Sequence, residues 1–186
     1  MIDAKDLTEE QAAILFIISK LSERFTIDKL YIQKIVFLVT RLLPDTLAIY
    51  DYEPAQMGMY SAEVMLTVKR EEDLGLIERL KLTPTGKDIV SQISKTESIR
   101  KIDGIFSSVE ELGKSDILYL LYNLYPEFTI NSQIKESVDS YKLQSATIDT
   151  KALREGAEKV IKTDKGNSIV VRKDGMVIRI IGYKEC

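Results

Sequence analysis

The residues that carry most acid–base and metal chemistry in proteins are scarce in this sequence. The 186-residue chain has no His and one Cys, Cys186. Without His, the Ser-His-Asp and Cys-His relays and every His metal ligand are excluded, and neither a GxxxxGK[ST] nor a GxGxxG phosphate-binding pattern occurs. The carboxylates form no distinctive pair. We therefore predict no catalytic residues, no cofactor and no metal; an enzyme relying on Asp, Glu, Lys or Tyr would need a deep pocket with carboxylates of perturbed pKa.

The most distinctive stretch, residues 50–64, reads YDYEPAQMGMYSAEV. It combines large apolar side chains with a proline and a glycine, and its candidate partner-binding residues are Tyr50, Tyr52, Met57, Met59 and Tyr60. One interpretation is structural: these side chains pack over a neighbouring helix, and Gly58 adopts a special backbone conformation. The other is a recognition surface, because Tyr and Met are enriched at interfaces and Met suits adaptable surfaces. The sequence leaves both open.

Charge is unevenly distributed along the chain. The net formal charge is −4 over residues 1–90, −3 over 91–150 and +4 over 151–186. The candidate nucleic-acid-binding residues are Lys69, Arg70, Arg172, Lys173 and Arg179. Lys69 and Arg70 belong to a helix expected over 62–74, whose six charged residues sum to −2. Because phosphate neutralisation dominates DNA affinity, this helix would contribute little to it. The basic face of the expected C-terminal hairpin is either a solvated structural surface or a cationic arm for an acidic protein or for nucleic acid.

Local signals predict a helix-rich first half, residues 1–95. A capping box at Thr8 starts one helix, and Thr26 is expected to cap a second that runs to Leu43 before Pro44. Ser61 is expected to cap the helix over 62–74, and Gly75 to end it as a second structural turn glycine beside Gly58. The segment LIERLKLT predicts a strand or two-stranded wing, followed by a helix starting at Thr83. This order is typical of a winged-helix-like, helix-turn-helix domain.

The remainder predicts a helical extension over 96–142 and an appendage over 151–186. Helices are expected over 98–112, from Ser115 to Pro126, and over 131–142, with 143–150 as a linker. The appendage is expected to be a helix over 151–162 and a β-hairpin around an Asp174-Gly175 turn, in which Ile169 faces Ile180. The expected class is mainly α with small β (α+β), with a winged-helix-like N-terminal half, helical middle and C-terminal helix plus hairpin.

An ordered set of segments resembles a known family. YIQKIVFL at 31–38, the 50–64 stretch, EDLGLIE at 72–78 and LTPTGK at 82–87 are similar to the SocA-like antitoxin/Panacea-domain proteins of archaea and bacteria, over about residues 10–140. The Tyr-Gly-Pro of that family is Met57-Gly58-Met59 here. The resemblance implies an antitoxin-like, chaperone-like or regulatory role without catalysis.

Two functions follow as expectations. The first is a non-catalytic interaction or regulatory protein that binds a protein partner, such as a toxin, or a second copy of itself. The second is a winged-helix DNA-binding transcriptional regulator. The lone Cys, the absence of a signal peptide and the absence of a membrane-spanning apolar run lead us to expect a cytoplasmic protein.

Overall fold

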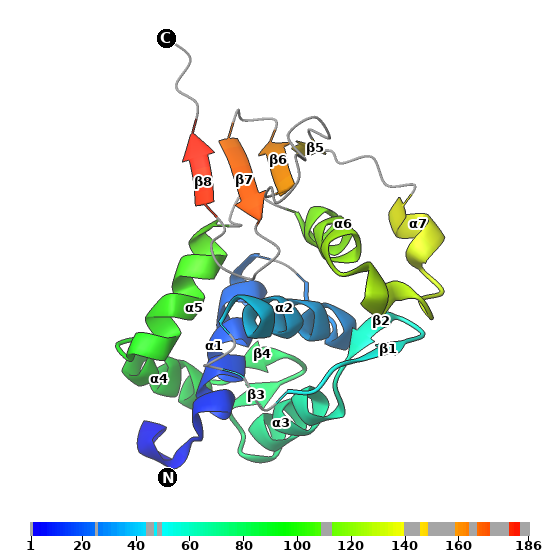
Figure 1. Cartoon of the computed structure of the whole chain (residues 1–186). Helices are drawn as coiled ribbons and strands as arrows, with labels where there is room; N and C mark the ends of the chain where they lie inside the picture. Colours follow the sequence, from blue (N-terminus) through cyan, green and yellow to red (C-terminus); the bar gives the residue numbers. More distant parts are fainter. Residues whose placement is uncertain are drawn as a thin grey trace.

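The structure is a computed structural model. It describes residues 2–24, 26–43, 47, 50–108, 113–139, 146–148, 159–163, 167–171 and 179–182. Its described part is mainly helical with small sheets, which confirms the predicted mixture of mainly α and a little β (Figure 1).

The N-terminal half is built on two buried helices. After a 3₁₀ turn, η1 (Ala4–Asp6), α1 (Glu9–Arg24) begins at the predicted capping box, where Thr8 and Gln11 exchange two hydrogen bonds. The N-cap of α2 (Lys29–Leu42) is Asp28, whose carboxylate accepts from the Tyr31 amide at 2.8 Å. The prediction of Thr26 as the cap was wrong, because the aspartate next to the helix satisfies the free amide directly.

Two short antiparallel hairpins flank the third helix. The first pairs β1 (Glu53–Ala55) with β2 (Gly58–Tyr60), and the second pairs β3 (Ile77–Glu78) with β4 (Lys81–Leu82). Between them lies α3 (Ala62–Asp73). Gly58 and Gly75 have φ of +83° and +70°, so both predicted turn glycines adopt the left-handed backbone conformation.

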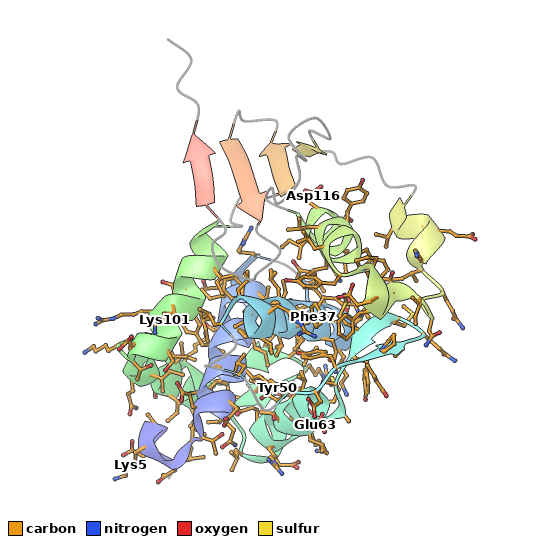
Figure 2. All side chains as sticks on the ribbon, in the orientation of Figure 1. Lys5, Phe37, Tyr50, Glu63, Lys101 and Asp116 are labelled. Atoms are coloured by element: carbon orange, nitrogen blue, oxygen red, sulfur yellow. The ribbon has the colours of Figure 1, made fainter. Side chains whose placement is uncertain are left out.

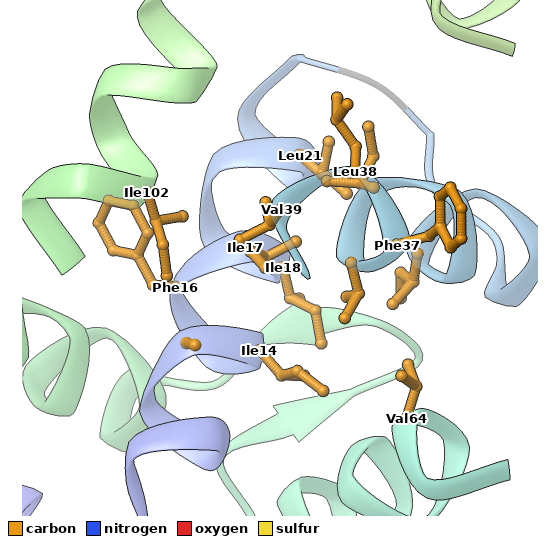
Figure 3. Packing of buried hydrophobic residues seen from close by; sticks show 14 of the residues in the cluster. Ile14, Phe16, Ile17, Ile18, Leu21, Phe37, Leu38, Val39, Val64 and Ile102 are labelled. Atoms are coloured by element: carbon orange, nitrogen blue, oxygen red, sulfur yellow. The ribbon is translucent and has the colours of Figure 1, made fainter. Parts of the chain in front are cut away.

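The hydrophobic core forms where α1 and α2 cross. Figure 3 shows Ile14, Ile17 and Ile18 of α1 beside side chains of α2, with Val64 of α3 below them. The segment Ala13–Ile18 of α1 and the segment Tyr31–Val39 of α2 are buried all round. Helices of this kind lie inside a bundle, as predicted for the second helix. Because β2 packs against α2, the β1–β2 hairpin rests on this buried core.

Later helices cover this core. They are α4 (Pro84–Ile93), α5 (Glu97–Ser108), α6 (Lys114–Leu124), the 3₁₀ turn η2 (Pro126–Thr129) and α7 (Lys135–Asp139). Thr83 caps α4 and Pro84 is its first residue, as predicted. Two predicted helix starts were wrong. Helix α6 is capped at Gly113 and not at Ser115, because the Asp116 carboxylate accepts from the Gly113 amide at 3.0 Å, and the helix predicted from 131 begins only at Lys135.

The C-terminal region contains a four-stranded antiparallel sheet with the order β5-β6-β7-β8. Its strands are β5 (Ala146–Ile148), β6 (Lys159–Thr163), β7 (Asn167–Val171) and β8 (Arg179–Gly182). The Ile169–Ile180 register is confirmed. The helix predicted as far as 162 was wrong over 159–162, where Val160 and Ile161 pair with β7 and favour a strand. The linker predicted over 143–150 was also wrong at Ala146–Ile148, which forms strand β5. The 174–175 turn and residues 151–158 lie outside the described residues.

Candidate protein-binding groove

A groove of about 620 Å³ lies between α2, the β1–β2 hairpin and α3. Its lining is mostly apolar, and it falls within the distinctive 50–64 stretch and the helices on either side. The lining residues are Lys29, Leu30, Gln33, Lys34, Glu53, Ala55, Gln56, Met57, Gly58, Met59, Tyr60 and Met65. A concave, mainly apolar surface with a few polar groups is the usual form of a binding site.

Two polar residues of α2 hold the hairpin from below. The side-chain NH₂ of Gln33 donates to the Ser61 carbonyl at 2.7 Å, and the side-chain oxygen of Gln33 accepts from the backbone N–H of Ser61 at 3.0 Å. The Lys34 ammonium donates to the carbonyls of Met57 and Met59, at 2.5 and 2.9 Å. Burial lowers the pKa of Lys34 to about 8. Since two of its three N–H donors are committed to the hairpin backbone, we assign Lys34 a structural role.

The far side of the hairpin is held by α6 and the segment that follows it. The Tyr122 hydroxyl donates to the Met57 carbonyl at 3.1 Å and lies 2.8 Å from Ser132 Oγ. The side-chain amide of Asn131 donates to the Pro54 carbonyl at 2.9 Å, and the backbone N–H of Gln133 donates to the Gln56 carbonyl at 2.8 Å. The hairpin is therefore fixed on both sides through its backbone.

Gly58 is required at the contact between these two supports. A Cβ at this position would lie 2.6 Å from the Tyr122 hydroxyl, and its φ of +83° already disfavours other residues. Sequence reasoning anticipated the special conformation of Gly58 but not the contact with Tyr122, which is 64 residues away in the chain.

The five predicted partner-binding residues divide into two groups. Tyr50 and Met59 are buried in the core, and Tyr52 packs edge-on against Phe37 with ring centroids 4.9 Å apart; Figure 2 marks Phe37 on α2 and Tyr50 below it. Met57 and Tyr60 are 39% and 38% exposed. Three residues of the stretch therefore pack against neighbouring elements, and two, Met57 and Tyr60, present side chains to solvent.

The predicted basic residues do not gather within the described part of the chain. Lys69 and Arg70 are exposed on α3, and Lys69 forms an ion pair with Asp73 at 2.6 Å. Arg179 starts β8, while Arg172 and Lys173 lie outside the described residues.

Sequence reasoning missed a buried carboxyl group on α3. Glu71 is fully buried, and neither of its carboxyl oxygens has a hydrogen-bond partner. Burial raises the pKa of Glu71 to about 8, so this residue is largely protonated at neutral pH. Glu71 lines neither the hairpin groove nor a second hollow of about 490 Å³, which lies between α1, β4 and α4. Spacing along α3 gave no signal for it, because its neighbours Glu72 and Asp73 are also acidic.

Within the described segments, no three residues of the metal-ligating acidic, Cys or His types come together. The helices described here are also too short or too polar to cross a bilayer. In comparisons with known proteins, no family model matches the chain and no curated protein matches it.

Proposed function

We propose that this chain is a non-catalytic, antitoxin-like interaction protein that binds a protein partner in the hairpin groove. The observation that carries the proposal is the pair of exposed apolar side chains, Met57 and Tyr60, on a hairpin whose backbone is fixed by α2, α6 and the segment after α6. A surface held in one conformation loses little entropy on binding, so such a pair suits the role of anchors.

The chemistry of the groove also supports binding over catalysis. Its buried lysine, Lys34, is committed to two backbone carbonyls, and the carboxyl with a strongly raised pKa, Glu71, lies outside the groove. Two of the four segments that carry the resemblance to SocA-like antitoxins, YIQKIVFL and the 50–64 stretch, contribute residues to this groove. Neutralising a toxin or delivering it to other machinery would require binding of this kind.

The test is purification of the tagged full-length chain from its native host, with the bound proteins identified by mass spectrometry. We expect one stoichiometric partner, which is lost from Met57→Ala and Tyr60→Ala while both variants keep the wild-type melting temperature. Leu74→Ala is the matched control, because Leu74 is a 43% exposed apolar residue outside the groove. Retention of the partner by both groove variants would refute the proposal, and recovery of only the chain itself would indicate a homodimer.

A second candidate is a winged-helix DNA-binding regulator. It is favoured by the β3–β4 hairpin directly after α3, the position of a wing after a recognition helix, and by the exposed cations Lys69, Arg70, Arg79 and Lys81. The Lys69–Asp73 ion pair weakens this case because it neutralises one of the cations. Gel-shift assays with duplex DNA test it: a regulator should bind at low salt with an affinity that falls steeply as salt rises. No binding at low salt would exclude it.

A further inference from the structure

The outer edge of β1 is closed to an added strand. Pro54 has no N–H to donate, and its carbonyl already accepts from Asn131. The carbonyl of Gln56 accepts from the Gln133 amide, and η2 packs along the strand. A partner strand pairing here would have to displace residues 126–133.

The outer edge of β2 is closed in the same way. It faces α2, whose Lys34 occupies the carbonyls of Met57 and Met59 and whose Gln33 occupies both backbone groups of Ser61. Strand addition depends on free main-chain groups at a sheet edge. Since both sides of the hairpin are occupied, a partner must bind through side chains.

An extended peptide would also leave its own backbone unsatisfied in this groove. Half of the twelve lining residues are Leu, Ala, Met or Tyr, and the hairpin carbonyls that could have accepted from the peptide are already bonded. A helix satisfies its backbone internally and needs only apolar contacts. Two methionines with solvent-accessible side chains, Met57 and Met65, line the groove, and flexible thioether side chains adapt to the ridges of a helix.

Two exposed residues of opposite charge lie at the rim of the groove and make its two sides electrostatically different. Lys29 is exposed on the α2 side and Glu53 is exposed on the β1 side, while Lys34 is buried. An acidic residue on a bound helix would be attracted to Lys29 and repelled by Glu53, which fixes the direction in which the helix lies.

We infer that the groove receives an amphipathic α-helix of the partner, with its apolar face on Met57, Tyr60 and Met65 and an acidic residue beside Lys29. The inference rests on the proposed function and specifies the structural class of the segment that is recognised. It assigns the groove to a helix and excludes strand addition as the binding mode.

In the experiment, peptides that bind the immobilised full-length protein are selected from two displayed libraries of equal size. One randomises the exposed face of a stable helical scaffold, and the other contains unconstrained linear peptides. We expect enrichment from the helical library, with apolar residues at i, i+3 or i+4 and i+7 and an acidic residue on one flank. The Kd of an enriched helix should rise about tenfold or more in Met65→Lys and stay unchanged in Leu74→Lys, because a charge in the groove prevents burial of an apolar anchor. Melting temperatures verify that both variants fold.

A charge exchange tests the orientation. Lys29→Glu should weaken the same helix, and replacing the acidic residue of that helix by Lys should restore binding to Lys29→Glu. Enrichment only of linear peptides with alternating apolar residues, or of helices indifferent to Met65→Lys, would overturn the inference. If the native partner is recovered and depends on Met57 and Tyr60 while no enriched helix competes with it, the helical mode is wrong and the proposed function stands. Native-partner binding that is insensitive to Met57 and Tyr60 would instead refute the proposed function.

Discussion

Replacing Glu71 by glutamine should remove most of the pH dependence of stability between pH 4.5 and pH 8. The carboxyl group is fully buried and unpaired, so the folded chain holds its proton until about pH 8, whereas the unfolded chain releases it near the ordinary value of 4.5. Between these values the folded state binds more protons than the unfolded state. The free energy of unfolding of the wild type must therefore fall as pH rises through this window.

The magnitude follows from the two pKa values. At about 1.4 kcal/mol per pH unit, a rise from 4.5 to about 8 corresponds to a loss of about 5 kcal/mol across the window. Water entering beside the ionised carboxylate reduces this loss, so we expect about 2–4 kcal/mol. Lys34 contributes mainly above this window. Its lowered pKa of about 8 changes the free energy of unfolding chiefly between pH 8 and 10.5, and equally in the wild type and in Glu71→Gln.

Urea unfolding at half-unit steps from pH 5 to pH 8.5 measures the effect. Glu71→Gln should give a nearly flat profile that lies above the wild type at pH 8, and Glu72→Gln, which changes the adjacent residue on the same helix, should follow the wild type. Parallel profiles for wild type and Glu71→Gln would show that Glu71 ionises normally in the folded state, which would refute the reasoning.

Three glycine substitutions are expected to differ in sign. Gly58→Ala should lower the free energy of unfolding by about 2 kcal/mol or more in urea titrations, because of its positive φ and the contact with Tyr122; adding Tyr122→Phe should recover part of the loss. Gly86→Ala should cost at least about 2 kcal/mol, since its Cβ would lie 2.0 Å from the Leu76 carbonyl oxygen, and a normal melting temperature would contradict this. Gly104→Ala should instead raise stability by about 0.5–1 kcal/mol in the same assay, because its Cβ meets nothing within 4 Å in α5.

Features decided by neighbouring residues were predictable. The Thr8 capping box, the Thr83 cap with Pro84 and the turn glycine at 75 each depend on contacts or dihedral angles within a few positions. The Ile169–Ile180 register was predictable from local residues as well, because the Asp174-Gly175 dipeptide is typical of a two-residue turn and the expected turn length sets the strand pairing.

Features decided by distant residues were not predictable. Gln33 and Lys34 looked like ordinary polar positions on a helix, and their partners lie 23 to 28 residues further along the chain. The strand state of β6 was not predictable from its own residues, because it depends on hydrogen bonds to the neighbouring strands β5 and β7. Burial of Tyr50 and Met59 likewise depends on the packing of α1 and α2, which the composition of the 50–64 stretch does not reveal.

The β1–β2 hairpin is held in place through hydrogen bonds to its main-chain carbonyl oxygens, and this affects which of its side chains can change during evolution. Lys34, Tyr122, Asn131 and Gln133 bind main-chain atoms, which every amino acid provides. The exposed side chains of Met57 and Tyr60 are therefore free to vary without loosening the support beneath them. Descendants of one ancestral chain could exchange these residues and acquire new partners at little cost in stability, so sequence divergence should concentrate at these positions while Gln33, Lys34 and Gly58 persist.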